Sequence, residues 1–372
     1  MDLRREHAQL KQLLTSGIDL ITQMPATAEH LRRVVPAFSL SLIRVDERCA
    51  PTSHYSEFFD DHSHALFASS GHVFSARSDD PAAFGNLLRN RRAVGTLVDT
   101  SPAYVAGATY QHLFKRNGIH HTLDAAIRHD GRPLGILGIF REARAPAFTR
   151  ADVARVCELY PLLVHAFLAE PLPADHVECD SALIVTAADG AIEWASPAAR
   201  RWLADAAFGV ERAHLTDRHV LPSACRRLCA ALAAVQAGAG GPQDVPSLTL
   251  PVPGGRLRLR AYGLSSRCSG EAATRCGIQL SLEMHRGLQV LRALEQAPLT
   301  PQQRRMAYAY YEGKRPREIG ALLGVSPSSF KTYRKELYAR LGVTSEAELR
   351  DALVALARSA TFDLQRHQPR RG

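Results

Sequence analysis

Three cations in the last quarter of the chain are spaced so that a single helix can present them together. Lys331, Arg334 and Lys335 stand at positions i, i+3 and i+4, with Tyr338 one turn later. Residues at this spacing lie on one face of an α-helix. A cationic helical face fits the DNA major groove, where phosphate oxygens and base-edge acceptors meet positively charged donors. The spacing therefore predicts nucleic-acid binding rather than bond-making chemistry.

The sequence around this stripe predicts short, capped helices that would position it. Thr300-Pro301 with Gln303 is a capping box, and the helix it opens stops at Gly313. A second short helix follows Pro316 and ends at Gly324. These signals predict two helices before the cationic one.

The third and fourth helices carry equally clear boundary signals. Ser326-Pro327 opens the third helix, which ends at Gly342, and Thr344 or Ser345 caps the fourth. The third helix turns an apolar face inward through Phe330, Leu337 and Leu341. Two short helices joined by a glycine-containing turn, the second of them basic, form a helix-turn-helix.

The positive charge of the chain is concentrated in this segment. The 372 residues carry a net charge of +9, and residues 298–358 contain 11 Lys and Arg against 6 Asp and Glu. More than half of the basic excess thus lies in one-sixth of the chain. A local basic excess is typical of a DNA-binding domain.

This segment resembles the LuxR-type helix-turn-helix domain. The shared motifs, in order, are Leu299-Thr300-Pro301, Glu312-Gly313, Glu318-Ile319, Leu323-Gly324-Val325-Ser326, Phe330-Lys331 and Leu341-Gly342-Val343. The resemblance implies that one group of positions faces bases and another lies near the phosphate backbone. The first group is Lys331, Thr332 and Lys335, and the second is Ser329, Tyr333 and Arg334. Ser328, Arg315 and Arg317 complete the predicted DNA-binding set.

Four positions depart from the pattern of that family. They are Gln303 in place of an acidic residue, Arg315 in place of a Ser or Thr cap, Phe330 in place of Val, and Tyr333 in place of His. Phe330 keeps a buried role, and Arg315 loses a cap but adds a charge directed at phosphate. These differences concern the target sequence rather than DNA binding itself.

Residues 1–170 predict a mixed α/β domain. Helical sequence over 1–24 precedes strands at 37–45 and 93–98, a hairpin of 122–129 and 134–141 around Asp130-Gly131, and a helix after Phe148. The order resembles a GAF sensor domain, most specifically from Leu123-Asp124-Ala125-Ala126-Ile127 through Gly131-Arg132-Pro133-Leu134-Gly135-Ile136-Leu137-Gly138 to Phe148-Thr149. The resemblance implies sensing without catalysis.

Two apolar stripes at the ends of this domain admit two interpretations. One stripe is Leu3, Leu10 and Leu14, and the other is Val156, Tyr160 and Leu163. Each could form the seam of a homodimer or pack onto the sheet of its own domain, because both roles use the same apolar face.

Residues 176–285 follow a Pro-rich linker and predict a second α/β domain. The expected elements are strands at 181–186 and 191–194 around Asp189-Gly190, helices through Trp202 and over 223–237, and strands at 247–251, 255–263 and 275–284. The order is similar to a PAS domain, with Ala188-Asp189-Gly190 and Trp194-Ala195-Ser196-Pro197 resembling its opening. Core packing is the favoured role of Trp194 and Trp202. Residues 359–372 form a basic tail that we expect to be disordered.

Metal and redox chemistry are the less favoured readings of the histidines and cysteines. Eight of the 16 histidines fall between 54 and 129, namely His54, His62, His64, His72, His112, His120, His121 and His129, yet they form no HExxH motif. Cys225 and Cys229 share a helical face and could be redox-active. Packing as two small apolar residues is the favoured interpretation. We therefore expect no metal and no cofactor.

Enzymatic motifs are missing as well: the chain has no GxxxxGK[ST] loop, no GxSxG and no HRD-type sequence. The sequence thus predicts an α+β multidomain protein of the cytoplasm that is not an enzyme. Its predicted function is transcription regulation, with two sensory domains controlling the DNA-binding helices. The expected partners are double-stranded DNA, a small-molecule effector, a second copy of the chain and, as a candidate, RNA polymerase, but no membrane. The alternative is a ligand- or redox-responsive sensor that acts mainly through protein–protein contacts.

Overall fold

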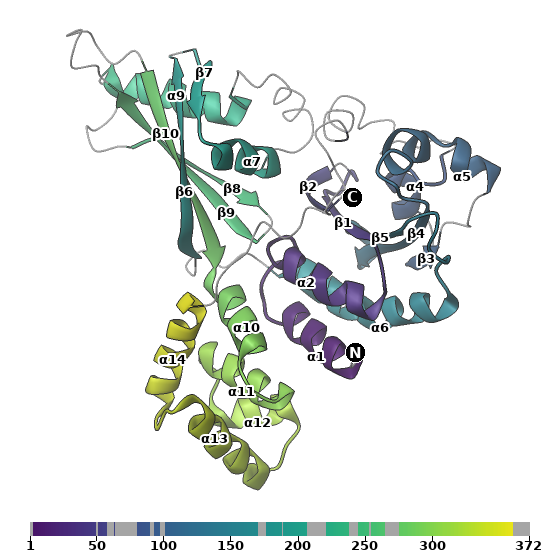
Figure 1. Ribbon diagram of the computed structural model, residues 1–372, viewed down its shortest axis with the longest axis vertical. Coiled ribbons are helices and arrows are strands. Elements are labelled where there is room, and N and C mark those ends of the chain that lie inside the picture. Colours follow the sequence, from purple (N-terminus) through teal and green to yellow (C-terminus); the bar gives the residue numbers. More distant parts are fainter. Residues whose placement is uncertain are drawn as a thin grey trace.

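The computed structural model describes most of the chain in three connected parts (Figure 1). The described residues are 3–49, 51–57, 63, 80–89, 93–96, 101–169, 176–187, 189–206, 221–237, 245–252, 254–264 and 275–359. Among them no helix is both long and apolar enough to cross a lipid bilayer. His62, His64, His72, Cys268 and residues 360–372 of the predicted tail lie outside the described residues.

The first part is a five-stranded antiparallel sheet, sheet A, with helices on both faces (Figure 1). Its strands run in the order β2-β1-β5-β4-β3. The elements are α1 (Leu3–Leu14), α2 (Leu20–Val34), β1 (Ser39–Val45), β2 (Pro51–Ser56), α4 (Phe84–Arg89), β3 (Val94–Thr96), α5 (Pro102–Ala106), the single π-helical turn η1 (Tyr110–Phe114), β4 (His121–His129), β5 (Arg132–Arg141) and α6 (Arg150–Leu168).

The predicted hairpin around Asp130-Gly131 is confirmed. Asp130 and Gly131 connect β4 and β5 with φ angles of 49° and 78°. Two consecutive positive φ angles are those of a type I′ turn, whose twist matches that of the flanking strands. The hairpin fixes the register of the two central strands of sheet A.

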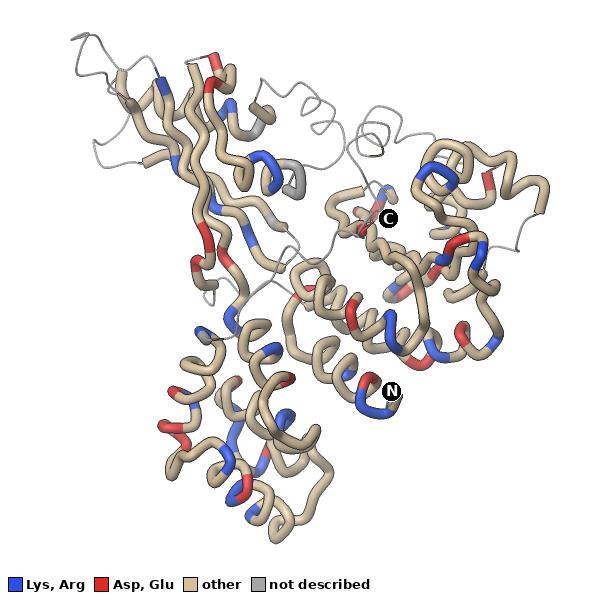
Figure 2. The backbone as a smooth tube through the Cα atoms, viewed as in Figure 1, with Lys and Arg blue, Asp and Glu red and all other residues tan. Residues whose placement is uncertain are grey.

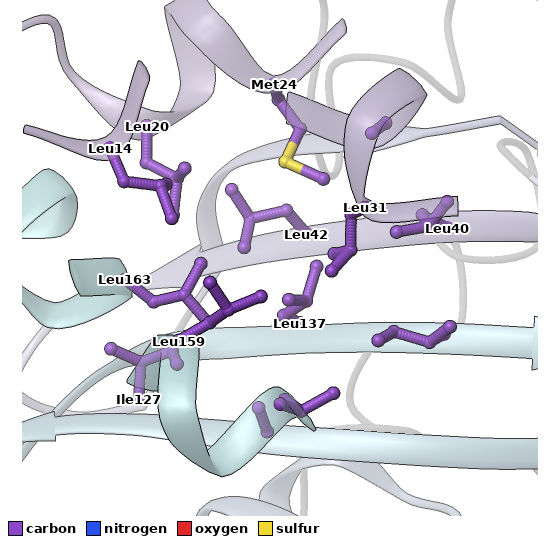
Figure 3. Close-up of a cluster of buried hydrophobic side chains, with 14 of the residues drawn as sticks. Leu14, Leu20, Met24, Leu31, Leu40, Leu42, Ile127, Leu137, Leu159 and Leu163 are labelled. Atoms are coloured by element: carbon purple, nitrogen blue, oxygen red, sulfur yellow. The ribbon is translucent and has the colours of Figure 1, made fainter. Parts of the chain in front are cut away.

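The core under α1, α2 and α6 decides between the two roles proposed for the terminal stripes. Leu10, Leu14, Val156 and Leu163 are at most 2% exposed and share one core cluster with residues of β1, β4 and β5. Figure 3 shows Leu14 and Leu163 in this cluster. Tyr160 donates a hydrogen bond of 2.9 Å to the Ala126 carbonyl. These residues therefore pack onto their own sheet, and the dimer seam is the wrong interpretation for them.

The amino-terminal helical sequence also differs from the expected single helical face. Gly17, with a φ of 74°, ends the first helical segment, and the Asp19 side chain caps α2 by accepting from the Thr22 amide at 3.0 Å. Leu3 is exposed at the free end of α1. Two helices therefore stand where the sequence pattern indicated one.

The second part is another five-stranded antiparallel sheet, sheet B, in the order β7-β6-β10-β9-β8. If the strands of each sheet are numbered from one, sheets A and B have the same strand order. The elements are β6 (His176–Ala187), β7 (Ile192–Ala195), α7 (Pro197–Ala206), α9 (Ser223–Gln236), β8 (Ser247–Val252), β9 (Gly255–Leu264) and β10 (Arg275–His285). All five predicted strands are found.

The two faces of sheet B differ in what covers them. One face is covered by α7 and α9. Ile184 and Ile278 of this face pack in one buried cluster with Trp202 of α7. The other face leaves Leu183 and Trp194 exposed, Trp194 at 61%. The predicted core role thus holds for Trp202 and is wrong for Trp194, because Trp194 lies on the outer side of an edge strand.

A connecting helix, α10 (Arg286–Gln296), leads from β10 to the carboxy-terminal helices (Figure 1). Leu288, Leu291 and Leu294 bury one side of it against a shared core. That core includes Leu13 and Ala26 of the first part and the helices beyond α10. Sequence analysis did not identify α10, although its leucine spacing is helical.

Candidate nucleic-acid interface

Four helices form the carboxy-terminal part: α11 (Pro301–Tyr311), α12 (Pro316–Leu323), α13 (Pro327–Leu341) and α14 (Glu346–Ser359). α13 carries the cationic stripe and lies at the opposite end of the molecule from the outer strands of sheet B (Figure 1). Phe330 and Leu337 bury its inner face with Met306, Ile319 and Leu353. This packing sets which side of α13 faces solvent.

The helix boundaries follow the predicted caps. Thr300 Oγ1 accepts from the Gln303 amide at 3.3 Å, and Gln303 Oε1 accepts from the Thr300 amide at 3.0 Å. Ser326 Oγ accepts from the Ser329 amide at 3.2 Å and so begins α13. Gly324 ends α12 in the left-handed conformation, with a φ of 64°. These caps satisfy helix-end amides and carbonyls that would otherwise lack partners.

Arg315 is capped in a way that its sequence position did not indicate. Its backbone amide donates to Glu318 Oε2 at 2.7 Å, and its guanidinium donates to Glu318 Oε1 at 2.9 Å. These bonds hold the pKa of Glu318 below its ordinary value. Arg315 therefore begins α12 through a carboxylate three residues later, and its charge is shared with that carboxylate.

The outer face of α13 presents exposed donors. Lys331, Thr332, Lys335 and Ser328 are all exposed, and neither lysine forms an ion pair with another described residue. The same holds for Arg317 on α12. Thr332 Oγ1 donates to the Ser328 carbonyl at 3.3 Å, which leaves its oxygen free to accept. Uncompensated ammonium groups on one helical face attract an anionic surface.

The other three predicted residues are half-buried. Ser329 packs into the serine cluster at the start of α13, with its Oγ 3.0 Å from Ser326 Oγ. Tyr333 packs at the edge of the core. Arg334 lies beside Tyr310, whose pKa is raised by burial and by Tyr338, while the guanidinium opposes the rise. α13 thus presents Lys331 and Lys335 more fully than Arg334.

Two arginines fix the neighbouring helices around α13. Arg340, near its end, donates to the Pro298 carbonyl at 2.7 Å. Arg305 of α11 donates to the Leu322 carbonyl at 3.0 Å and so joins α11 to α12. Charged residues are distributed along the backbone of these helices (Figure 2). The stripe therefore sits on a rigid scaffold, as recognition by a helix requires.

Polar side chains connect α10 to the first part. His30 of α2 places Nδ1 2.8 Å from Glu6 Oε2 and Nε2 3.0 Å from Glu295 Oε1 of α10. Burial lowers the pKa of His30, but the two carboxylates outweigh it and the net pKa is raised. This contact was not predicted, because its partners are 265 residues apart.

Histidines and cysteines that the structure describes take part in other contacts. Among the described residues no three His, Cys, Asp or Glu side chains could hold a metal ion together. His120 Nδ1 lies 2.9 Å from the Tyr110 hydroxyl, which is a hydrogen bond within the first part. Cys229 Sγ lies 3.7 Å from Cys276 Sγ, and both are free thiols.

Two family models match separate parts of the chain. Residues 297–353 match the bacterial regulatory proteins of the luxR family, and residues 19–162 match the GAF domain. These families are generally non-enzymatic. A comparison with curated proteins gave no match.

Solved structures give distant similarities. A GAF domain/HD domain protein from Geobacter sulfurreducens is 19% identical, with a TM-score of 0.29, over 42% of this chain and 94% of that one. VqmA from Vibrio cholerae, solved with ligand and DNA, is 17% identical, with a TM-score of 0.26, over 48% and 82%. SdiA from Escherichia coli is 9% identical, with a TM-score of 0.32, over 95% and 97%.

Proposed function

We propose that this chain, which carries a LuxR-type DNA-binding domain behind a GAF domain, reads the DNA major groove with α13 under the control of its sensory part. The observation that carries the proposal is the exposed pair Lys331 and Lys335 on a helix whose opposite face is buried. Sequence-specific binding needs donors that are both free and rigidly placed. Both conditions meet on α13.

The predicted residues divide into two roles. Lys331, Thr332 and Lys335 face the bases, since they are exposed hydrogen-bond donors in the middle of the helix. Ser328, Ser329, Tyr333, Arg334, Arg315 and Arg317 lie along the flanks and contact phosphates. Arg315 reaches phosphate only by leaving Glu318, so it contributes less than Arg317, which has no such partner among the described residues.

The protein acts as a homodimer, because one helix-turn-helix covers one half-site and two-fold operators need a two-fold protein. The outer face of sheet B replaces the terminal stripes as the contact surface. It exposes Leu183, Trp194, Tyr262 and Leu264. Arg275 pairs with Glu193 at 2.7 Å beside them, so two copies of this face can exchange ion pairs across a two-fold axis.

The remaining assignments follow from this domain order. The GAF-like domain spans 1–170, the PAS-like domain 176–285 and the DNA-binding domain 298–358. The sensory domains bind an effector without turning it over. The protein works in the cytoplasm, where its DNA target lies, with RNA polymerase as a further candidate partner.

A mobility-shift assay with genomic fragments tests the proposal. The full chain should select fragments, and the selected fragments should share a two-fold motif. The double variant Lys331→Ala/Lys335→Ala should lose that selection, whereas the control Lys115→Ala, an exposed lysine of the first part, should keep it. Equal binding by all three proteins would refute the role of α13.

A further inference from the structure

A row of small and polar residues crosses sheet A on the face away from α2 and α6. Strand register places Gly95, Asp124, Gly138, Ser41 and Ser56 directly opposite one another on five successive strands. Residues directly opposite in a sheet share a face. Leu123 and Ala125, the neighbours of Asp124 in β4, belong to the core on the other face. The row is therefore a strip of low side-chain volume across the whole sheet.

Asp124 stands in this row with a carboxylate oxygen that has no partner among the described residues. The residue is 8% exposed, and its Oδ2 accepts no hydrogen bond from any of them. Both residues opposite it, Gly95 and Gly138, lack side chains that could cover it. Burial raises the pKa of Asp124 to about 7, and only the hydroxyl of Thr122 opposes the rise. A buried carboxylate oxygen without a partner is costly in a folded protein.

Further unpartnered polar atoms lie on the same face. Ser56 Oγ, in the row, and Ser39 Oγ, two residues before Ser41 on β1, make no hydrogen bond with any described residue. Ser41 and Ser56 are half-buried, so the row is not sealed along its length. The Phe140 ring lies over Gly138, in the space that a Cβ would take, and gives the row an apolar surface there. Such an arrangement joins one carboxyl group, several hydroxyls and an apolar surface.

We infer that this row binds a small organic cation, whose ammonium or guanidinium group donates to Asp124. The inference rests on the proposed function and gives its effector a chemical class. A cation would restore the missing partner of the carboxylate. An anion would add a like charge beside it. A metal ion would need ligands that the described residues do not gather.

Isothermal titration calorimetry on the full chain tests this with four probes. Butylamine and phenethylamine are the cations, butanol is the neutral counterpart and butyrate the anion. Wild-type protein should bind the amines at millimolar concentration and neither counterpart. Because the amine binds ionised Asp124, its affinity should fall about tenfold for each pH unit below about 7.

Two variants make the result specific. Asp124→Asn keeps the shape but removes the charge, so amine binding should fall at least tenfold and lose its pH dependence. Asp130→Asn removes an exposed carboxylate from the β4–β5 turn, where Asn is equally suited, and should bind as wild type does. Circular dichroism confirms that each variant is folded. Ser41→Val, which fills the row without changing charge, should also weaken binding.

The proposal is overturned if the amines bind wild type and Asp124→Asn equally, if neither amine binds wild type, or if butyrate binds as well as butylamine. DNA binding of the same preparations is measured without amine. Loss of DNA binding by wild type would contradict the proposed function, whereas intact DNA binding without amine binding would contradict this inference alone.

Discussion

His30 and Glu295 join the sensory part to the helix that leads to the DNA-binding domain. His30 Nε2 lies 3.0 Å from Glu295 Oε1, while its other ring nitrogen lies 2.8 Å from Glu6. The histidine side chain is 5% exposed. Behind it, Leu13 and Ala26 share one apolar core with α10 and α11. A change in α1 or α2 therefore acts directly on the helices that position α13.

This junction should weaken as pH rises. The pKa of His30 is raised in the folded protein, so its contribution is complete below its ordinary pKa and is lost as pH rises through the folded value. The pKa of Glu6 is lowered despite burial, because His30 and Arg33 favour its charge, so its contribution is lost only in acid. The protection factors of the α10 amides, which are corrected for the intrinsic pH dependence of exchange, should fall as pH rises above the ordinary histidine pKa. His30→Gln should remove this fall, and protection factors that stay constant with pH in wild type would refute the coupling.

Asp124 should make the first part less stable as pH rises. Its folded pKa of about 7 exceeds the ordinary value of 3.8, so the folded state holds the proton longer, and stability falls between about pH 4 and 7. The full effect is about 4 kcal/mol at 1.36 kcal/mol per pKa unit. Urea unfolding at pH 5 and 8 should show that the free energy of unfolding of Asp124→Asn, relative to that of wild type, is higher at pH 8 than at pH 5. Asp130→Asn, with its exposed carboxylate, should track wild type at both values.

The connecting helix should belong to the folding unit of the DNA-binding domain. Leu288, Leu291 and Leu294 of α10 pack with Leu353 of α14. Removing α10 exposes this surface, and each buried leucine contributes about 1.5–3 kcal/mol. A fragment of residues 286–359 should therefore melt at a clearly higher temperature than one of residues 298–358. Equal melting temperatures would show that α10 does not stabilise the DNA-binding domain.

Leu163→Glu should unfold the first part rather than separate two subunits. Leu163 of α6 is 2% exposed and packs in the core between that helix and sheet A. Burying a carboxylate there without a partner costs several kcal/mol. Circular dichroism should show loss of structure. Trp194→Glu, on the exposed face of sheet B, should instead keep the spectrum and yield monomers in sedimentation. A folded, monomeric Leu163→Glu protein would reverse these assignments.

The sequence predicted features whose signals are local and missed those that depend on distant partners. The Thr300–Gln303 capping box and the Asp130-Gly131 turn are each set by a few adjacent residues, and both form as expected. The His30–Glu295 contact spans 265 positions and left no pattern in the sequence. The polar row around Asp124 depends on the register of five strands, which the sequence does not specify.

The Lys331 and Lys335 side chains should read bases, and Arg334 should hold the backbone. Lys331→Ala or Lys335→Ala should reduce the preference for operator over scrambled DNA by about 1–3 kcal/mol. Arg334→Ala should weaken both DNAs similarly and lower the salt slope by about 1. Competition binding measures both effects, with Lys115→Ala as the charge-matched control. Equal losses on both DNAs for Lys331→Ala would contradict base reading.

Fluorescence anisotropy of the full chain on an operator selected from genomic fragments tests the central claim most directly. We expect wild type to bind the operator far more tightly than scrambled DNA. We also expect Lys331→Ala/Lys335→Ala to bring the two affinities together while Lys115→Ala leaves them apart. A double variant that still distinguishes operator from scrambled DNA as wild type does would show that α13 is not the reading helix.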